Sequence, residues 1–447
     1  MIVAGAMIGS GIFIVPADIA REVGAAGWLL GVWVLSGVMT VVAARCYAEL
    51  AAMFPHAGGQ YVFLREAFGP LAGFLYGWTL LLVIQTGTIA AVAVAFAKFL
   101  AVLAPSLGAA PLATVAGLPI SAQQIVAVLV IAGLTAANLR GLATGKTIQN
   151  AFTVAKVGAL VAVIALGLGV GFSSHVVAAN WATSFEASRS HGPLVAAFGA
   201  AMVGALFSSD AWNNVTFTAA EVRDPRRSLP RALILGTGLV VTLYLLTNVA
   251  YLAVLPVGGD PTGATAAARG IAHATDDRVA TAVAAEVLGA DAAGVMAILI
   301  MISTFGCVNG LVLAGPRLFQ AMAADGLLLG GLAHLSVRGV PARALLLQGV
   351  WSSLLALSGR YGQLLDFVIA TALLFYGLTV AGLLRLRRRN GIEGGRFLPL
   401  LYVVLSAAVC VDLLIVKPEY TWPGFAITAL GIPVYLFARG ARTSRSG

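Results

Sequence analysis

Five long stretches of this chain contain no charged residue, and they limit its possible folds more than any other feature. They cover residues 27–44, 67–97, 232–259, 292–316 and 367–384. Each is near or above the roughly 18 to 20 apolar residues that a helix needs to cross a bilayer. They lack strand-like alternation and are too long for barrel strands, so they predict membrane-spanning helices.

Composition supports an all-α membrane protein. Of 447 residues, 60% are hydrophobic and only 10% are charged, against about 25% charged residues in a soluble domain. We predict twelve transmembrane helices, at approximately 1–21, 27–53, 68–102, 121–139, 145–171, 193–222, 229–256, 290–322, 341–358, 362–386, 397–416 and 421–438.

The basic residues predict the orientation of these helices. Nineteen of the 27 Lys and Arg residues fall on one side of the predicted arrangement and six on the other. The positive-inside rule places the richer side in the cytoplasm, together with both termini and a tail at 439–447. This explains the net charge of +9 without a nucleic-acid partner. The loop 257–289 then lies outside, with a short helix at 279–288. The abrupt start within a span leaves open a short cytoplasmic segment before it.

The first predicted span is interrupted by Gly9-Ser10-Gly11. Glycine costs about 1 kcal/mol relative to alanine in a helix interior. Unwinding from Ile8 to Ile12 leaves backbone N–H groups free at the positive end of the outer half-helix, where a carboxylate binds well. The alternative is a face of small residues for helix packing, because Gly5 and Gly9 have that spacing.

A second interruption, Ser208-Ser209-Asp210-Ala211, breaks the sixth predicted span. The carbonyl groups that end the first half-helix, near Phe207 and Ser208, suit an ammonium group. Asp210 could hold that amine, gate a proton, or cap a second half-helix. Phe207 could be a lid over a bound solute or an ordinary core aromatic.

Breaks in spans 1 and 6 imply two five-helix repeats. An odd number of helices per repeat forces opposite orientations, so we predict the LeuT-type 5+5 inverted fold with discontinuous helices 1 and 6. The repeats cover residues 1–171 and 193–386, and two further helices follow at 397–438.

Lys156 lies about ten residues into the fifth span, which at 1.5 Å per residue is roughly 15 Å deep and close to the bilayer centre. A lysine at that depth needs a partner inside the bundle. It could act as a fixed cation in place of a coupling Na⁺, release its proton when desolvated, or reach the interface. Lys98, near the outer end of span 3, is expected to reach the interface.

The sequence gives no sign of an enzyme, a cofactor or a metal site. The five histidines fall near or in predicted loops without metal-ligand or nucleophile spacing. The three cysteines lie in apolar surroundings, which predicts no disulfide framework. We expect only amino acid substrates and the lipid bilayer as partners.

Several motifs together resemble the amino acid–polyamine–organocation superfamily. They are residues 5–13, residues 47–55 with Gly58-Gly59-Gln60-Tyr61, Trp212-Asn213-Asn214, and residues 225–230. Phe152-Thr153-x-x-Lys156 and the 303–310 segment are similar to the L-type branch and its bacterial serine/threonine and alanine-serine-cysteine exchangers. Ala211 departs from the glycine found in many relatives.

The resemblance implies sodium-independent exchange of small or neutral L-amino acids by alternating access in the cell membrane. Proton-coupled symport is the alternative. The resemblance also implies contact between Lys156 and the region of Ser303 and span 1, and a gating role for Phe207. Animal members bind a heavy chain through an external cysteine, but residues 101–120 contain none, so we expect no covalent heavy-chain partner.

Overall fold

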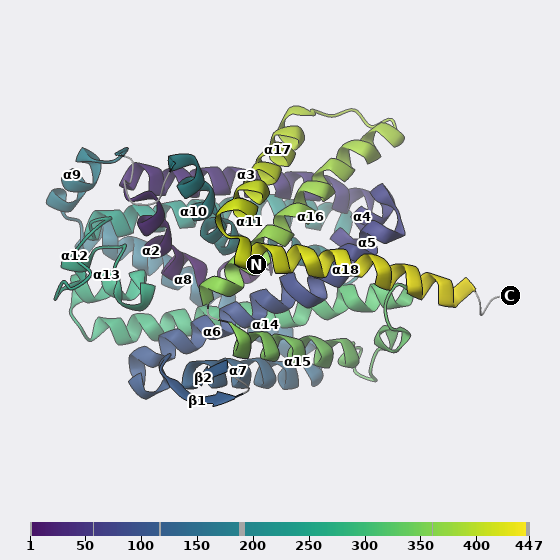
Figure 1. Cartoon of the computed structure of the whole chain (residues 1–447), viewed down its shortest axis with the longest axis horizontal. Helices are drawn as coiled ribbons and strands as arrows, with labels where there is room; N and C mark the ends of the chain where they lie inside the picture. Colours follow the sequence, from purple (N-terminus) through teal and green to yellow (C-terminus); the bar gives the residue numbers. More distant parts are fainter. Residues whose placement is uncertain (1, 57, 116–117, 187–192, 360, 444–447) are drawn as a thin grey trace.

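The computed structural model describes residues 2–56, 58–115, 118–186, 193–359 and 361–443. It is mostly helical, and the long helices α3, α6, α11, α14 and α16 run roughly along the long axis of the molecule (Figure 1). Their apolar side chains face both the interior and the outer surface, as a membrane environment requires.

The helices that match the predicted spans are α1 (Ile2–Met7) with α2 (Gly11–Val23), α3 (Ala26–Met53), α5 (Pro70–Thr79) with α6 (Gln85–Leu103), α7 (Ala122–Leu139), α8 (Leu142–Ala165), α10 (Leu194–Ser208), α11 (Pro225–Val254), α14 (Ala292–Ala324), α15 (Ala342–Ser358), α16 (Tyr361–Arg389), α17 (Phe397–Val416) and α18 (Pro418–Thr443). Among the described residues, nine helical segments are long and apolar enough to cross a membrane. The broken first helix, the short α15 and α18 are not among these nine, so twelve spans remain a prediction.

Connecting segments form more structure than we predicted. Helix α13 (Val279–Leu288) matches the short helix expected in the 257–289 loop. Two further helices, α4 (Gln60–Phe68) and α9 (Ser174–Ala182), lie in predicted loops. Strands β1 (Pro111–Val115) and β2 (Leu118–Ser121) pair as an antiparallel hairpin. These elements are too short to show a clear hydrophobic period, so sequence patterns alone did not reveal them.

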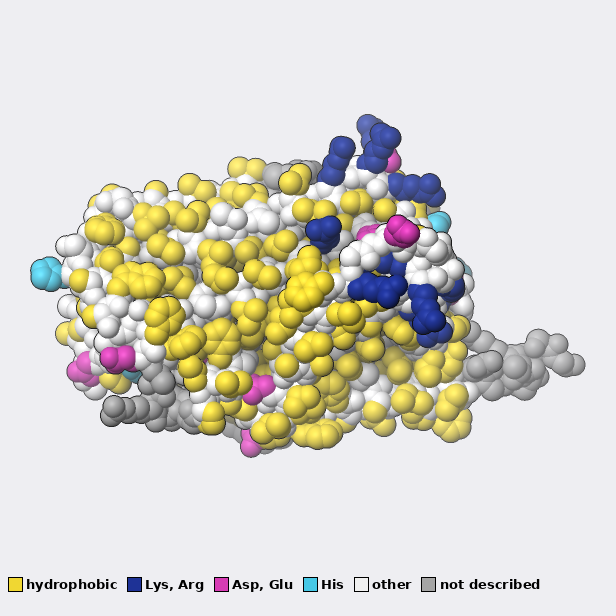
Figure 2. All heavy atoms as spheres, turned by 90° about the horizontal axis from the view of Figure 1, so that it is seen from above, with side chains coloured by type: hydrophobic (Ala, Val, Ile, Leu, Met, Phe, Trp, Pro, Cys, Tyr) yellow, Lys and Arg dark blue, Asp and Glu magenta, His cyan; other side chains and the backbone are white. Residues whose placement is uncertain are grey.

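Basic side chains are unevenly distributed along the long axis on the visible face (Figure 2). Figure 2 shows Lys and Arg side chains gathered at one end of the visible face. That end includes the last turn of α16, with Arg387, Arg388 and Arg389. Helices α9, α12 (Ala266–Arg269) and α13 gather at the opposite end (Figure 1).

Both predicted interruptions are present as breaks in helical geometry. Residues 8–10 separate α1 from α2, and residues 209–211 follow α10. The expectation of an α-helical second half after the second break is wrong. Two 3₁₀ turns follow instead, η4 (Trp212–Thr216) and η5 (Ala219–Glu221).

Two local features explain these 3₁₀ turns. Ala211 adopts a left-handed conformation, with φ of 64°, which interrupts the helix. Thr216 then donates its hydroxyl to the Asn213 carbonyl, a local bond that competes with α-helical pairing.

The two breaks meet because α2 crosses α10 at very close range. A Cβ on Gly11 would overlap the Ser208 side chain and lie 2.8 Å from the Ser208 Cα. Gly204 of α10 in turn leaves room for Val15 of α2. Gly11 is therefore a helix-packing residue, whereas the sequence suggested a packing alternative only for Gly5 and Gly9.

Candidate functional site

The first break presents a row of unused backbone donors. Within the described residues, the N–H groups of Gly9, Ser10, Gly11 and Ile12 donate to no backbone carbonyl. They precede or open α2, so the positive end of that helix faces the break. Such a group of amides suits a carboxylate.

Lys156 of α8 holds the other side of this break. Its ammonium group donates to the carbonyl oxygens of Gly5 at 2.7 Å and Ile8 at 2.8 Å. The side chain is 0% exposed. Ser303 of α14 donates to the same Ile8 oxygen at 3.4 Å. The ammonium therefore occupies the place where carbonyls ending a half-helix attract a cation.

The second break is joined to the first by a tyrosine. The hydroxyl of Tyr244, on α11, lies 3.1 Å from both the Met7 and the Ser208 carbonyl oxygens. One hydroxyl thus binds the ends of α1 and α10 together. Sequence reasoning missed Tyr244, because nothing in its local sequence indicates that α11 reaches both breaks.

Asp210 begins a buried polar chain behind the breaks. Tyr376 of α16 donates to its carboxylate at 2.5 Å and lies 3.5 Å from the Asn213 side-chain oxygen. Asn213 donates to Gln60 at 2.9 Å, and Gln60 donates to Thr379 at 3.1 Å. With no α-helix directly following, Asp210 does not act as the helix cap that we considered.

A small cavity lies between the two breaks. Of the predicted binding residues, it is lined by Gly9, Ser10, Gly11, Phe207, Ser208 and Asp210. Its water-accessible space is about 10 Å³, roughly one water molecule and far below the ~300 Å³ of a small ligand pocket. The cavity is contracted, so a solute needs side chains or helices to move.

Three predicted substrate-binding residues, Ile8, Ile12 and Ser209, do not line this cavity. The Ile8 carbonyl accepts from Lys156, and the Ile12 carbonyl lies 3.3 Å from the hydroxyl of Tyr251. The N–H of Ser209 donates to the Ala205 carbonyl and ends α10. These residues shape the two breaks through their backbone.

A larger cavity of about 670 Å³ opens beyond an aromatic pair. Tyr361 of α16 lines this larger cavity, and Phe207 lines the small one. Their rings meet edge to face at 6.2 Å, and the Tyr361 hydroxyl lies 3.1 Å from the Ser10 hydroxyl. Tyr361, a second residue that sequence reasoning missed, thus separates the two spaces.

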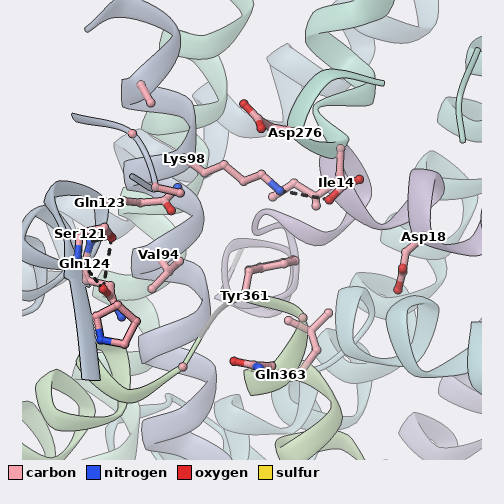
Figure 3. A pocket seen from close by; sticks show the side chains of 18 of the residues that line it. Ile14, Asp18, Val94, Lys98, Ser121, Gln123, Gln124, Asp276, Tyr361 and Gln363 are labelled. Carbon is pink, nitrogen blue, oxygen red and sulfur yellow. Dashed lines mark hydrogen bonds and ion pairs between the residues drawn. The ribbon is translucent and has the colours of Figure 1, made fainter. Parts of the chain in front are cut away.

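We call this larger cavity the vestibule. Figure 3 shows Lys98 reaching in from one wall, Asp18 on the opposite wall, and Tyr361 between them. Lys98 does not simply extend to an interface as expected, because its ammonium group is 3.3 Å from Asp277. The vestibule lies toward the end that carries α12 and α13.

Comparisons with known proteins agree with this architecture. A family model described as amino acid permease matches residues 1–434. The mouse b(0,+)-type amino acid transporter 1 is 30% identical over 427 residues, which cover 94% of this chain and 82% of the mouse protein. The human large neutral amino acids transporter small subunit 2 is 31% identical over 444 residues, 97% of this chain and 78% of the human protein. The chain therefore belongs to the amino acid permease family of the amino acid–polyamine–organocation superfamily, and it is a transporter rather than an enzyme.

Proposed function

We propose that this protein is a sodium-independent exchanger of small or neutral L-amino acids that works by alternating access. The observation that carries this proposal is the Lys156 ammonium, which binds two carbonyls of the first break at 2.7 and 2.8 Å. The Lys156 ammonium at this point takes the position that a coupling Na⁺ would otherwise occupy.

The two breaks supply complementary groups for a zwitterion. The free N–H groups of Ser10, Gly11 and Ile12 face a carboxylate, with the Ser10 hydroxyl beside them. Carbonyls near Phe207 and Ser208 face the amine. The Ser208 carbonyl already accepts from Tyr244, but a carbonyl oxygen can accept a second bond. The small residues Gly9, Ser10 and Ser208 around the breaks favour a small side chain.

The observed state fits one half of a transport cycle. The vestibule holds about 670 Å³, while the space between the breaks is contracted and the polar chain from Asp210 to Gln60 is intact. Transport then requires Tyr361 and Phe207 to part, followed by rocking of the broken helices against the rest of the fold. We propose that the two inverted repeats, 1–171 and 193–386, supply that motion.

The charge distribution supports an orientation in the cell membrane. The basic end of the molecule, which includes the last turn of α16, suits the cytoplasm. The termini then lie in the cytoplasm, and the vestibule opens outside. Cys46, Cys307 and Cys410 are all buried and unpaired, so we propose that the transporter works without a covalently linked heavy chain.

Proteoliposomes test the proposal directly. Uptake of labelled serine or alanine should require internal amino acid, should persist when choline replaces Na⁺, and should be competed by small neutral amino acids in a panel of twenty. Liposomes without internal amino acid are the control. Uptake that needs Na⁺, or that proceeds equally into empty liposomes, would contradict exchange.

Proton-coupled symport is the second candidate, because the buried carboxylate of Asp210 faces the cavity with a tyrosine hydroxyl as its partner. An inward proton gradient would then drive accumulation into liposomes without internal amino acid. Asp210→Asn would abolish that accumulation. If exchange instead ignores the gradient and survives Asp210→Asn, symport is ruled out.

A further inference from the structure

The turn formed by residues 272–278 joins two helices across the vestibule. On one side Arg21, in the last turn of α2, donates to the Asp277 carboxylate at 2.7 Å and to the Ala272 carbonyl at 2.8 Å. On the other side Lys98 of α6 is 3.3 Å from the second Asp277 oxygen. Arg278 donates to the Lys98 carbonyl, also at 3.3 Å. The turn therefore has two attachments to each helix.

The backbone of this turn is strained where the attachments meet. Asp276 and Asp277 both adopt left-handed conformations, with φ of 52° and 59°. Consecutive non-glycine residues in this region are uncommon and persist when surrounding contacts hold them. Asp277 is the better held of the two, because its side chain is 33% exposed and bonded to two cations, whereas that of Asp276 is 62% exposed and bonded to Arg278.

We propose that Asp277 is a positioning residue that sets the separation of α2 and α6 and so controls entry to the vestibule. Arg21 and Lys98 face each other across the width of one carboxylate. With that carboxylate present, each cation is attracted to the turn. Without its charge, Lys98 loses its paired carboxylate and Arg21 keeps only the exposed Asp18, at 3.2 Å. The two cations then repel each other across the turn and push the helices apart.

Val94 provides a position at which to measure this separation. It lies on α6 one turn before Lys98, lines the vestibule, and is 4% exposed. A cysteine at this position should react slowly with a membrane-impermeant thiol reagent while Asp277 holds the helices. The native cysteines are buried, and the protein without Val94→Cys gives the background.

Asp277→Asn in this Val94→Cys protein should increase the labelling rate by about threefold to tenfold. Asp276→Asn is the matched control, since it removes a carboxylate from the same left-handed turn but leaves Arg21 and Lys98 paired with Asp277. It should change the rate by less than about twofold. Asparagine tolerates the left-handed region, so neither substitution adds backbone strain.

A rescue experiment separates charge repulsion from simple loss of structure. Adding Lys98→Met to Asp277→Asn removes one of the two cations, so labelling should return toward the parent rate. Equal labelling in Asp277→Asn and its parent would overturn the proposal. So would equal effects of Asp276→Asn and Asp277→Asn, or a double variant as reactive as Asp277→Asn.

If Asp277→Asn is not recovered as a monodisperse protein, Lys98→Met alone gives the answer. It cuts one attachment to α6 without creating repulsion, so we expect labelling about twofold faster, and an unchanged rate would overturn the proposal. The inference rests on the proposed transport function only in that the vestibule is taken as the entry route for an amino acid. Labelling is measured without any amino acid, so its failure and the failure of exchange are distinguishable.

Discussion

Replacing Lys156 with methionine keeps the apolar stem of the side chain but removes the ammonium group that binds the first break. Two carbonyl oxygens, those of Gly5 and Ile8, then lose their charged donor in a fully buried position. Hydrogen bonds to charged groups contribute about 1.5–3 kcal/mol each, so the gross loss is about 3–6 kcal/mol.

The net loss is smaller, because burying an ammonium group is itself costly. We take about 3 kcal/mol as the net destabilisation of the broken geometry. At about 1.4 kcal/mol per tenfold change, this corresponds to roughly a 100-fold fall in exchange rate. The assay is exchange of labelled amino acid in proteoliposomes, with protein recovery and orientation measured in parallel.

Ser303→Ala is the matched control for this prediction. It removes a neutral, longer bond of 3.4 Å to the same Ile8 carbonyl, so the expected fall is no more than about fivefold. An exchange rate for Lys156→Met within about threefold of the parent would refute the reasoning, because the break would then not depend on a cation. A Ser303→Ala effect as large as that of Lys156→Met would argue against charge as the cause.

Three further perturbations test other parts of the structure. Tyr361→Ala removes the ring contact with Phe207, worth about 0.5–1.5 kcal/mol, so release of internal amino acid into amino-acid-free buffer should rise several-fold; unchanged release would exclude a gate here. Gly11→Ala should lower the unfolding temperature in detergent, and adding Ser208→Ala should not restore it, because the Ser208 Cα itself lies 2.8 Å from the new Cβ. Burial would raise the pKa of Asp277, but Lys98 and Arg21 outweigh it and hold that pKa below its usual range. The carboxylate therefore stabilises the fold at neutral pH and loses this effect as pH falls below about 4, so the difference in unfolding temperature between the parent and Asp277→Asn should shrink there.

Much of the architecture follows from local sequence properties. Uncharged stretches place the long helices, since lipid excludes unpaired backbone groups and leaves few alternatives to a helix. The third predicted span illustrates this. It was expected at residues 68–102, and it corresponds to α5 and α6 joined by a π-helical turn, Leu80–Ile84. Both breaks were located from local sequence as well, because Gly9-Ser10-Gly11 and the Ser208–Ala211 segment interrupt apolar runs with small and polar residues.

The partners of the site residues were less accessible to sequence reasoning. A family resemblance led us to expect that Lys156 lies near span 1 and Ser303. Only the structure shows that the carbonyl oxygens of Gly5 and Ile8 accept its hydrogen bonds. Tyr244 and Tyr361 approach the breaks from α11 and α16, more than 200 residues away from Met7 and Ser10 in the chain. No local pattern encodes contacts of that kind.

The sequence by itself determined that this chain forms membrane helices, where two of them break, and that a lysine lies deep within the fifth. These properties depend on hydropathy and on backbone preferences of neighbouring residues. Tertiary structure alone decided that Gly11 serves helix packing, that 3₁₀ turns follow Asp210, and that Asp277 joins α2 to α6. Those outcomes depend on the close approach of distant segments, where steric fit and paired charges outweigh local preference.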